Sequence, residues 1–266
     1  MNNWDSLVFI FVGFALSVAA TLLGAYIYAR IVDFRKKRPM RQILNFGNDS
    51  LLCVFPHREE VAEAILPRTS TEDFLAINNI ISALLQVGWK KKLGVRDSRR
   101  VSSDDRKRNL VVICSPKSNS LTSEVQEEME ERYRQFFYFQ DDGSRCLVTD
   151  GSGEWKSHSI QQREDFLNAG GDPHSIPEHA FDDVAIINKI TNPWNDKTKV
   201  LVVAGIRGIG TWAAGECIKK QWEQIYDSLP EDGKDRDFSA LILASYHNCD
   251  ITRIEVERVI PLVRRR

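Results

Sequence analysis

A glycine-rich turn is the clearest chemical signal in this chain. An apolar run, KVLVVA at residues 199–204, leads into GIRGIGT, and a helical pattern follows from Trp212. Glycines at such a junction permit tight turning, and a helix N-terminus offers N–H groups and partial positive charge to an anion. An arginine side chain can add a forked contact to a phosphate. The predicted anion site comprises Gly205, Arg207, Gly208, Gly210 and Thr211.

The spacing of these glycines limits what the turn indicates. The pattern G-x-x-G-x-G-T differs from the dinucleotide fingerprint G-x-G-x-x-G, and it lacks the Gly-Lys-Ser/Thr ending of a phosphate loop. Glycines that serve only strand–helix packing are the alternative interpretation, and the spacing does not decide between the two.

Two other loops carry side chains that suit the same kind of ligand. SPKSN, residues 115–119, follows the apolar run NLVVIC, and Pro56-His57-Arg58 follows LLCVF. Because the carboxyl ends of parallel strands share one sheet edge, we expect these loops beside the glycine turn. For Asn119, capping of the next helix is the alternative role. The predicted ligand residues here are Ser115, Lys117, Asn119, His57 and Arg58.

A fourth loop is expected near the same edge. Asn192 and Trp194 follow another predicted strand, although a proline-containing turn is a sufficient reason for both.

Signatures of catalysis and of metal binding are missing from the sequence. There is no G-x-S-x-G and no H-E-x-x-H, and the five histidines are scattered without ligand spacing. The five cysteines form no C-x-x-C pair, which favours reduced thiols in the core. A net charge of -1 gives no reason to expect duplex nucleic acid as a partner. We therefore predict no catalytic residue and no metal. The cofactor is unknown, and a nucleotide is a possible ligand.

Strand and helix patterns alternate along the rest of the chain. Helical patterns cover residues 71–87, 122–133 and 212–229, residues 136–149 indicate a hairpin, and residues 90–108 favour an exposed loop or short helix. This alternation predicts an α/β fold: a Rossmann-like sheet, mostly parallel but mixed, with helices on both faces. The predicted strands of the sheet are 51–55, 109–114, 184–190, 199–204, 238–246 and 251–262.

The N-terminal region predicts a single membrane anchor. Residues 7–29 carry no charge and, at about 1.5 Å per residue, are long enough to cross a hydrocarbon core. Basic residues follow the run, so the bulk of the chain is expected on the cytoplasmic side of the inner membrane. We expect an extracytoplasmic tail at 1–6, a transmembrane helix at 7–29, a basic juxtamembrane linker at 30–48 that lies against anionic lipid headgroups, and a cytoplasmic Rossmann-like domain at 49–266.

Small side chains recur along the anchor at spacings of three and four. Such a stripe lets transmembrane helices approach closely, so it favours homo-oligomers within the bilayer. The alternative is that small residues are simply common in these helices. The predicted packing residues are Gly13, Ser17, Ala20 and Gly24.

Residues 50–266 resemble the Rossmann-like ligand-sensing domains of prokaryotic regulators and conflict systems, some of which are fused to transmembrane segments. The resemblance rests on the SPKSN loop with its flanking strand and helix, on NPWN and on VLVVAGIRGIGTWAAGE. The layout also resembles transmembrane effectors of nucleotide-signalled antiphage defence. The resemblance implies a sensor that binds a phosphate-bearing nucleotide second messenger, oligomerises, and permeabilises or remodels the lipid bilayer. Two alternatives stay open: a membrane-tethered enzyme acting on a nucleotide or nucleotide-sugar, and a membrane adaptor that recruits a cytoplasmic protein.

Overall fold

The structure is a computed structural model that describes most of the predicted α/β domain and the end of the predicted anchor. Most of the anchor lies outside the described residues, as do Gly13, Ser17, Ala20 and Arg58. The described ranges are 22–34, 37–47, 50–57, 70–141, 146–157, 165–172, 181–231, 237–247 and 250–265.

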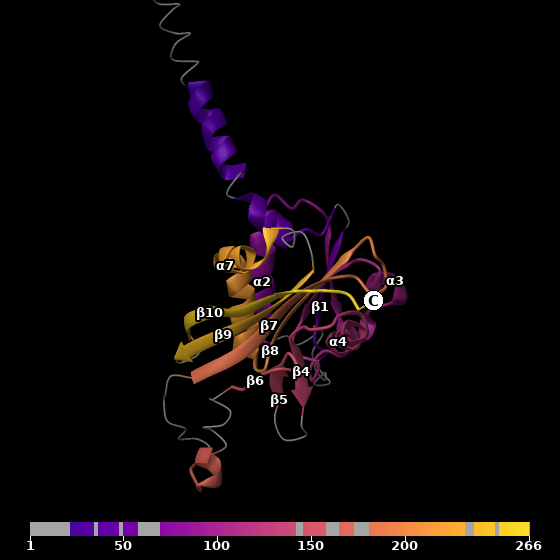
Figure 1. The fold of residues 1–266 in the computed structure, drawn as a ribbon, viewed down its shortest axis with the longest axis vertical. Helices are drawn as coiled ribbons and strands as arrows, with labels where there is room; N and C mark the ends of the chain where they lie inside the picture. The colour runs from indigo at the N-terminus through magenta and orange to yellow at the C-terminus, as the bar shows by residue number, and fades with distance from the viewer. Residues whose placement is uncertain are drawn as a thin grey trace, which may run out of the picture.

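A seven-stranded mixed sheet forms the centre of the protein (Figure 1). Its strand order is β10-β9-β7-β8-β3-β1-β2. The neighbours β2, β1, β3 and β8 are parallel, whereas β7, β9 and β10 continue the sheet in antiparallel steps. The predicted α/β class with a mixed sheet is therefore confirmed. The strands are β1 (Leu51–Phe55), β2 (Leu93–Asp97), β3 (Asn109–Ile113), β7 (Phe181–Thr191), β8 (Lys199–Gly205), β9 (Phe238–His247) and β10 (Asp250–Pro261).

Helices cover both faces of this sheet, as the sequence predicts. On one face, α2 (Thr71–Gln86), α6 (Gly208–Lys220) and α7 (Trp222–Ser228) share an apolar cluster with the strands. On the other face, α4 (Ser120–Arg132) belongs to a second cluster. Every residue of β1 and β3 is buried, and strands buried on both faces appear in a sequence as continuous apolar runs. This explains why LLCVF and NLVVI could be recognised.

α2 and α6 pack closely because α6 contains a glycine at the contact. A Cβ atom on Gly215 would lie 2.7 Å from backbone atoms of Ala76. α2 begins after Ser70, whose hydroxyl accepts the Asp73 N–H at 3.2 Å and caps the helix. This packing brings the start of α2 to the start of α6.

The predicted hairpin forms a small separate sheet. β4 (Tyr138–Asp141), β5 (Cys146–Thr149) and β6 (Glu154–Trp155) pair antiparallel. Phe137, Phe139 and Val148 join the apolar cluster of α4, so the small sheet covers the main sheet rather than extending it.

The charged stretch at residues 90–108 contains more structure than its sequence predicts. It forms the edge strand β2, a short 3-10 helix at Ser98–Arg100 and helix α3 at Ser103–Arg106. Within the described residues β2 pairs with β1 alone, and none of its own residues is fully buried, so backbone pairing holds it without an apolar pattern. The predicted helix at 212–229 is likewise divided, because α6 ends at Lys220 and α7 begins at Trp222.

The N-terminal part of the chain enters the core earlier than residue 49. Residues 22–34 and 37–43 are helical, and residues 40–46 contribute Met40, Ile43, Leu44 and Phe46 to the core. In Figure 1 the helix at 22–34 projects from one end of the domain. None of the helices in the described part of the chain has both the length and the apolar character that crossing a bilayer requires.

Candidate functional site

The three predicted loops meet at one edge of the sheet. β1, β3 and β8 are adjacent and parallel, so the residues after their carboxyl ends lie side by side. The arrowhead of β9 marks this edge in Figure 1, at the end of the domain opposite the helix at 22–34.

The boundary between β1 and β3 is a topological switch point. The helix after β1 covers one face of the sheet, and the helix after β3 covers the other. Open α/β sheets bind ligands outside the carboxyl ends of the strands at such a point. His57 follows β1 and the SPKSN loop follows β3, so two of the predicted loops border it.

A carboxylate of the protein itself binds the N–H groups at the start of α6. Asp183 Oδ2 accepts hydrogen bonds from the Gly210 N–H at 2.8 Å and the Arg207 N–H at 3.0 Å, and Oδ1 accepts the Val184 N–H at 2.9 Å. Burial raises the pKa of Asp183 to about 7, although these N–H groups and the Arg207 charge favour its ionised form. Asp183 therefore occupies the position that the sequence assigns to a phosphate.

Backbone packing requires two glycines of the turn. A Cβ atom on Gly205 would lie 2.4 Å from the Thr211 nitrogen, and one on Gly210 would lie 2.5 Å from Asp183 Oδ2. The buried Thr211 hydroxyl accepts the Gly205 N–H at 2.9 Å. These contacts support the interpretation that the glycines serve packing.

Arg207 and Gly208 form the more accessible part of the turn. The half-buried Arg207 donates from Nη1 to Tyr246 Oη at 3.1 Å. A Cβ atom on Gly208 would lie 3.3 Å from the Cβ atom of Glu72 in α2. α6 starts at Gly208, four residues before the predicted Trp212. Acidic side chains from β7 and α2 thus lie at this helix start, and their charge opposes the binding of another anion there.

In the SPKSN loop, the Asn119 side chain makes hydrogen bonds within the protein. Its Oδ1 accepts the Leu121 N–H at 3.1 Å as the cap of α4, and its Nδ2 donates to the Ile113 carbonyl at 2.8 Å. The side chains of Asn119 and Ser115 are both buried. Lys117 is the exposed member of the three predicted residues in this loop.

His57 is oriented by a carboxylate from the neighbouring strand. Its Nδ1 lies 2.8 Å from Asp97 Oδ2, and Asp97 Oδ1 accepts the Arg99 N–H at 2.8 Å. The imidazole remains 20% exposed. Sequence reasoning identified His57 but missed Asp97, because Asp97 ends a strand that has no apolar pattern.

A contact between Cys114 and Asp73 also escaped prediction. The Cys114 thiol donates to Asp73 Oδ1 at 2.7 Å, and both side chains are buried. Cys114 has a φ of 83°, a conformation that non-glycine residues rarely adopt. Because both groups are enclosed, the contact fastens the start of α2 to the end of β3.

Asn192 and Trp194 lie at the opposite edge, which corrects the prediction. β7 is antiparallel to β8, so its carboxyl end lies beside the amino ends of the parallel strands. There Asn192 Nδ2 donates to the Arg106 and Arg108 carbonyls at 2.7 Å each. The prediction treated β7 as another parallel strand.

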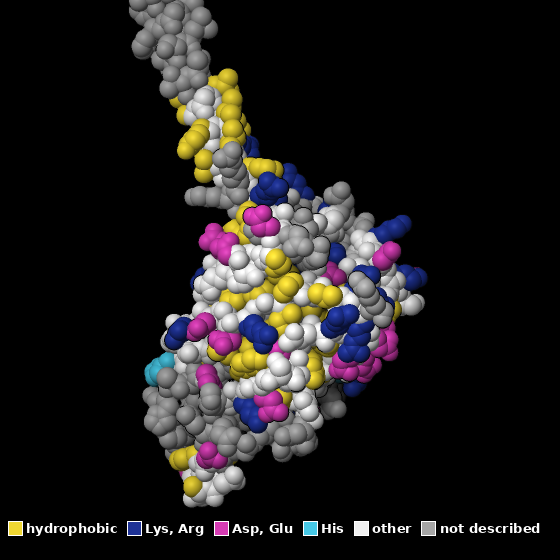
Figure 2. All heavy atoms as spheres, in the orientation of Figure 1, with side chains coloured by type: hydrophobic (Ala, Val, Ile, Leu, Met, Phe, Trp, Pro, Cys, Tyr) yellow, Lys and Arg dark blue, Asp and Glu magenta, His cyan; other side chains and the backbone are white. Residues whose placement is uncertain are grey.

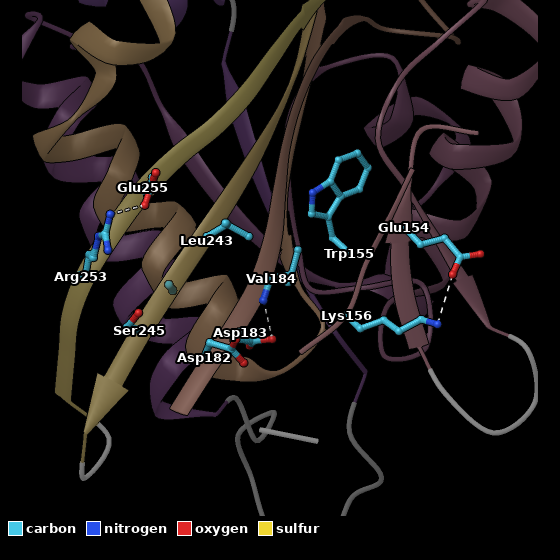
Figure 3. A pocket seen from close by; sticks show the side chains of 11 residues that line it. Glu154, Trp155, Lys156, Asp182, Asp183, Val184, Leu243, Ser245, Arg253 and Glu255 are labelled. Carbon is cyan, nitrogen blue, oxygen red and sulfur yellow. Dashed lines mark hydrogen bonds and ion pairs between the residues drawn. The ribbon is translucent and has the colours of Figure 1, made fainter. Parts of the chain in front are cut away.

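A groove of about 470 Å³ opens beside Asp183 on the sheet face that carries α4. In Figure 3 the Trp155 ring lies across from Val184 and Leu243. The volume suits a small molecule, but acidic side chains outnumber basic ones in the lining by four to two, which suits a polyphosphate poorly. Sequence reasoning missed the groove because four separate strands build it. Its rim contains Asp182 and the ion pairs Lys156–Glu154 at 3.2 Å and Arg253–Glu255 at 2.6 Å.

Comparison of the chain with protein-family models, with curated proteins and with solved structures finds no match. Within the described ranges, no group of His, Cys, Asp and Glu side chains is arranged to hold a metal ion.

Proposed function

We propose that the protein is a membrane-anchored sensor whose α/β domain binds a phosphate-bearing nucleotide at the switch point. One observation carries this proposal. β1, β3 and β8 are adjacent and parallel, so His57, Lys117 and Arg207 extend three basic side chains from neighbouring loops. Basic side chains that converge from several loops are the usual means of holding a polyphosphate.

Within this edge, we assign the phosphates to side chains rather than to the start of α6. Asp183 already binds two N–H groups there, and Glu72 adds a second acidic side chain. Lys117 is exposed and His57 is partly exposed, one on each side of the boundary between β1 and β3. The ligand then spans this boundary. To reach its far end, Arg207 exchanges its hydrogen bond to Tyr246 Oη of β9 for one to a phosphate oxygen.

The exposed helix at residues 22–34 supports the membrane part of the proposal. Its large apolar side chains are 47–71% exposed, among them Leu22, Ile27 and Tyr28. Leu22, Ile27 and Tyr28 belong to the end of the uncharged run of the predicted anchor. A ligand that binds an assembled form better than a dispersed form shifts the population toward assembly. We propose that the anchors then pack together and permeabilise or remodel the bilayer.

The binding step is tested with the full chain in mild detergent. Calorimetry would measure the affinity for ATP, ADP-ribose and a cyclic dinucleotide. We expect Lys117→Ala to weaken binding of the preferred nucleotide roughly tenfold or more, because it removes a charge-assisted contact. Lys197→Ala, another exposed lysine at the opposite edge, is the matched control. Equal affinity of both variants, or no binding by the unaltered chain, would reject the site.

Permeabilisation of the bilayer is tested separately in dye-loaded liposomes that contain the full chain. We expect the nucleotide that binds best to release the dye, and Lys117→Ala to reduce this release in proportion to its affinity. Binding without release would retain the sensor and reject permeabilisation.

One contact favours a second candidate function. His57 is oriented by Asp97 at 2.8 Å, the arrangement of a general base whose ring is held by a carboxylate. An enzyme acting on a nucleotide or nucleotide-sugar would use it for proton transfer. Turnover of the same three nucleotides, abolished by His57→Ala, would favour this candidate over a sensor without chemistry.

A further inference from the structure

We propose that a concave surface beside the anchor binds the headgroup of an anionic phospholipid. The surface lies between the helices at residues 22–34 and 37–43 and encloses about 570 Å³. The inference rests on the anchoring part of the proposed function and does not depend on nucleotide binding. Its principal lining residues are Arg30, Arg38, Arg41, Ile27, Ile31 and Phe34.

One side of this surface is strongly basic. Arg30, Arg38 and Arg41 are all exposed. Asp33, the carboxylate among the described lining residues, is paired with Lys37 at 2.8 Å, so three positive charges remain in excess. Guanidinium groups bind the oxygens of a phosphate through paired hydrogen bonds. The charge therefore fits a phosphodiester.

Two contacts hold Arg41 in place at this surface. Its Nε donates to the Val87 carbonyl at 3.0 Å, and its guanidinium lies 5.2 Å from the centre of the Phe34 ring. Arg41 thus links the anchor helix to the folded domain. A headgroup that binds Arg41 is held at a defined place on the protein.

The other side of the surface is apolar, which decides between a lipid and a free phosphate. Ile27 and Ile31 are each 47% exposed and Phe34 is 55% exposed, at the spacing of one helix face. A free phosphate ion gains nothing from these side chains, whereas the glycerol and acyl chains of a lipid cover them. Figure 2 shows the same order: apolar side chains along the helix and Lys and Arg side chains at its base.

The segment after this surface is fixed to the core. Met40, Ile43 and Leu44 are buried, and the Lys189 ammonium in β7 donates to the Gln42 carbonyl at 2.8 Å. A bound headgroup would therefore restrict the orientation of the whole α/β domain relative to the bilayer. The sheet edge proposed to bind nucleotide would then face away from the membrane.

Native mass spectrometry of the detergent-solubilised full chain tests the inference. The probe is an equimolar mixture of phosphatidylglycerol and phosphatidylcholine with identical acyl chains. We expect the unaltered chain to retain phosphatidylglycerol several-fold over phosphatidylcholine. Arg30→Gln/Arg38→Gln should bring the two lipids to nearly equal retention, because it removes two of the three positive charges in excess at this surface. Lys156→Gln/Arg253→Gln removes the same charge at the far end of the domain and should retain the preference.

Each outcome has a defined consequence. Equal retention of the two lipids by the unaltered chain would overturn the proposal without any variant. An undiminished preference in Arg30→Gln/Arg38→Gln would also overturn it, and a melting curve confirms that this variant folds. Displacement of the lipid by excess inorganic phosphate would identify a phosphate site instead. If the full chain remained in solution without detergent, anchoring and the lipid site would fail together, whereas nucleotide binding would be unaffected.

Discussion

The starts of α4 and α6 look alike in the sequence and differ in the structure. Each helix follows a buried parallel strand and a short loop, and each loop was expected to bind an anion. At α4, Asn119 caps the helix from the position directly before it. At α6, Arg207 occupies that position without a capping side chain, and Asp183 reaches the N–H groups from β7.

The difference shows how a glycine turn before a helix should be interpreted. The first N–H groups of every helix need acceptors from outside the helix. A Ser, Thr, Asp or Asn at the cap position supplies one locally, and in its absence water, a ligand or a distant side chain supplies it. At α6 the acceptor is a distant carboxylate, so the turn alone does not indicate a ligand.

Removing Asp183, the distant acceptor at the start of α6, should have the largest effect on the free energy of unfolding. Asp183→Ala leaves the buried N–H groups of Arg207 and Gly210 without their acceptor and should lower the free energy of unfolding by about 3 kcal/mol. Urea unfolding of the detergent-solubilised chain measures this change. Asp196→Ala alters an exposed aspartate and should stay within about 0.5 kcal/mol. A loss below about 1 kcal/mol for Asp183→Ala would mean that another group satisfies these N–H groups.

Substitution of Gly210, which leaves room for the Asp183 carboxylate, should have the second-largest effect on the free energy of unfolding. Gly210→Ala places a Cβ atom 2.5 Å from Asp183 Oδ2 in the starting geometry, and relieving this clash should cost about 2 kcal/mol. Gly208→Ala is the matched control in the same helix turn, because the nearest atom to its new Cβ is Glu72 Cβ at 3.3 Å, well outside the 2.5 Å contact at Gly210. The same unfolding measurement compares them. Equal effects of the two substitutions would indicate that Asp183 moves away without penalty.

Removing the local cap of α4 should lower the free energy of unfolding less than Asp183→Ala or Gly210→Ala. Asn119→Ala removes the acceptor of the Leu121 N–H and the donor to the Ile113 carbonyl, which should cost about 1 to 1.5 kcal/mol. Asn119→Ser retains a capping oxygen and should recover part of this loss, whereas Ser118→Ala changes an exposed neighbour and should be close to neutral. If Asn119→Ala proved more destabilising than Asp183→Ala, the ranking of local and distant caps would be reversed.

Much of the fold could be predicted because burial leaves a trace in the sequence. β1, β3 and β8 are apolar throughout, and α2 has a capping serine and an amphipathic pattern. The edge strand β2 could not be found, because backbone hydrogen bonds hold it and its side chains are not fully buried. The direction of β7 was also missed, since a buried strand has the same apolar pattern in either direction.

The candidate site was predictable only where its residues act locally. His57, Lys117 and Arg207 follow recognisable strands, so their shared edge could be expected from parallel pairing. Asp97 and Asp183 contact that edge from β2 and β7, and their roles depend on pairings that no local pattern encodes.

The smallest expected contrast between the two caps is their response to pH. Asp183 titrates and Asn119 does not. Burial raises the pKa of Asp183 to about 7 in the folded protein, so the folded state binds a proton that an unfolded aspartate has released. The contribution of Asp183 to stability is present in full below the ordinary carboxyl pKa of about 4 and is lost as the pH rises through about 7.

Between pH 6 and 8 the unaltered chain should therefore lose stability as the pH rises. The carboxyls of Asp105, Asp150 and Asp237 do not compensate, because their pKa values are lowered and they stay ionised over this range. Asp183→Asn keeps an oxygen acceptor for the α6 N–H groups without titrating. The melting temperature of this variant should change less between pH 6 and 8 than that of the unaltered chain. Parallel curves for the two proteins would mean that Asp183 stays ionised in the fold, and the start of α6 would then hold a full negative charge.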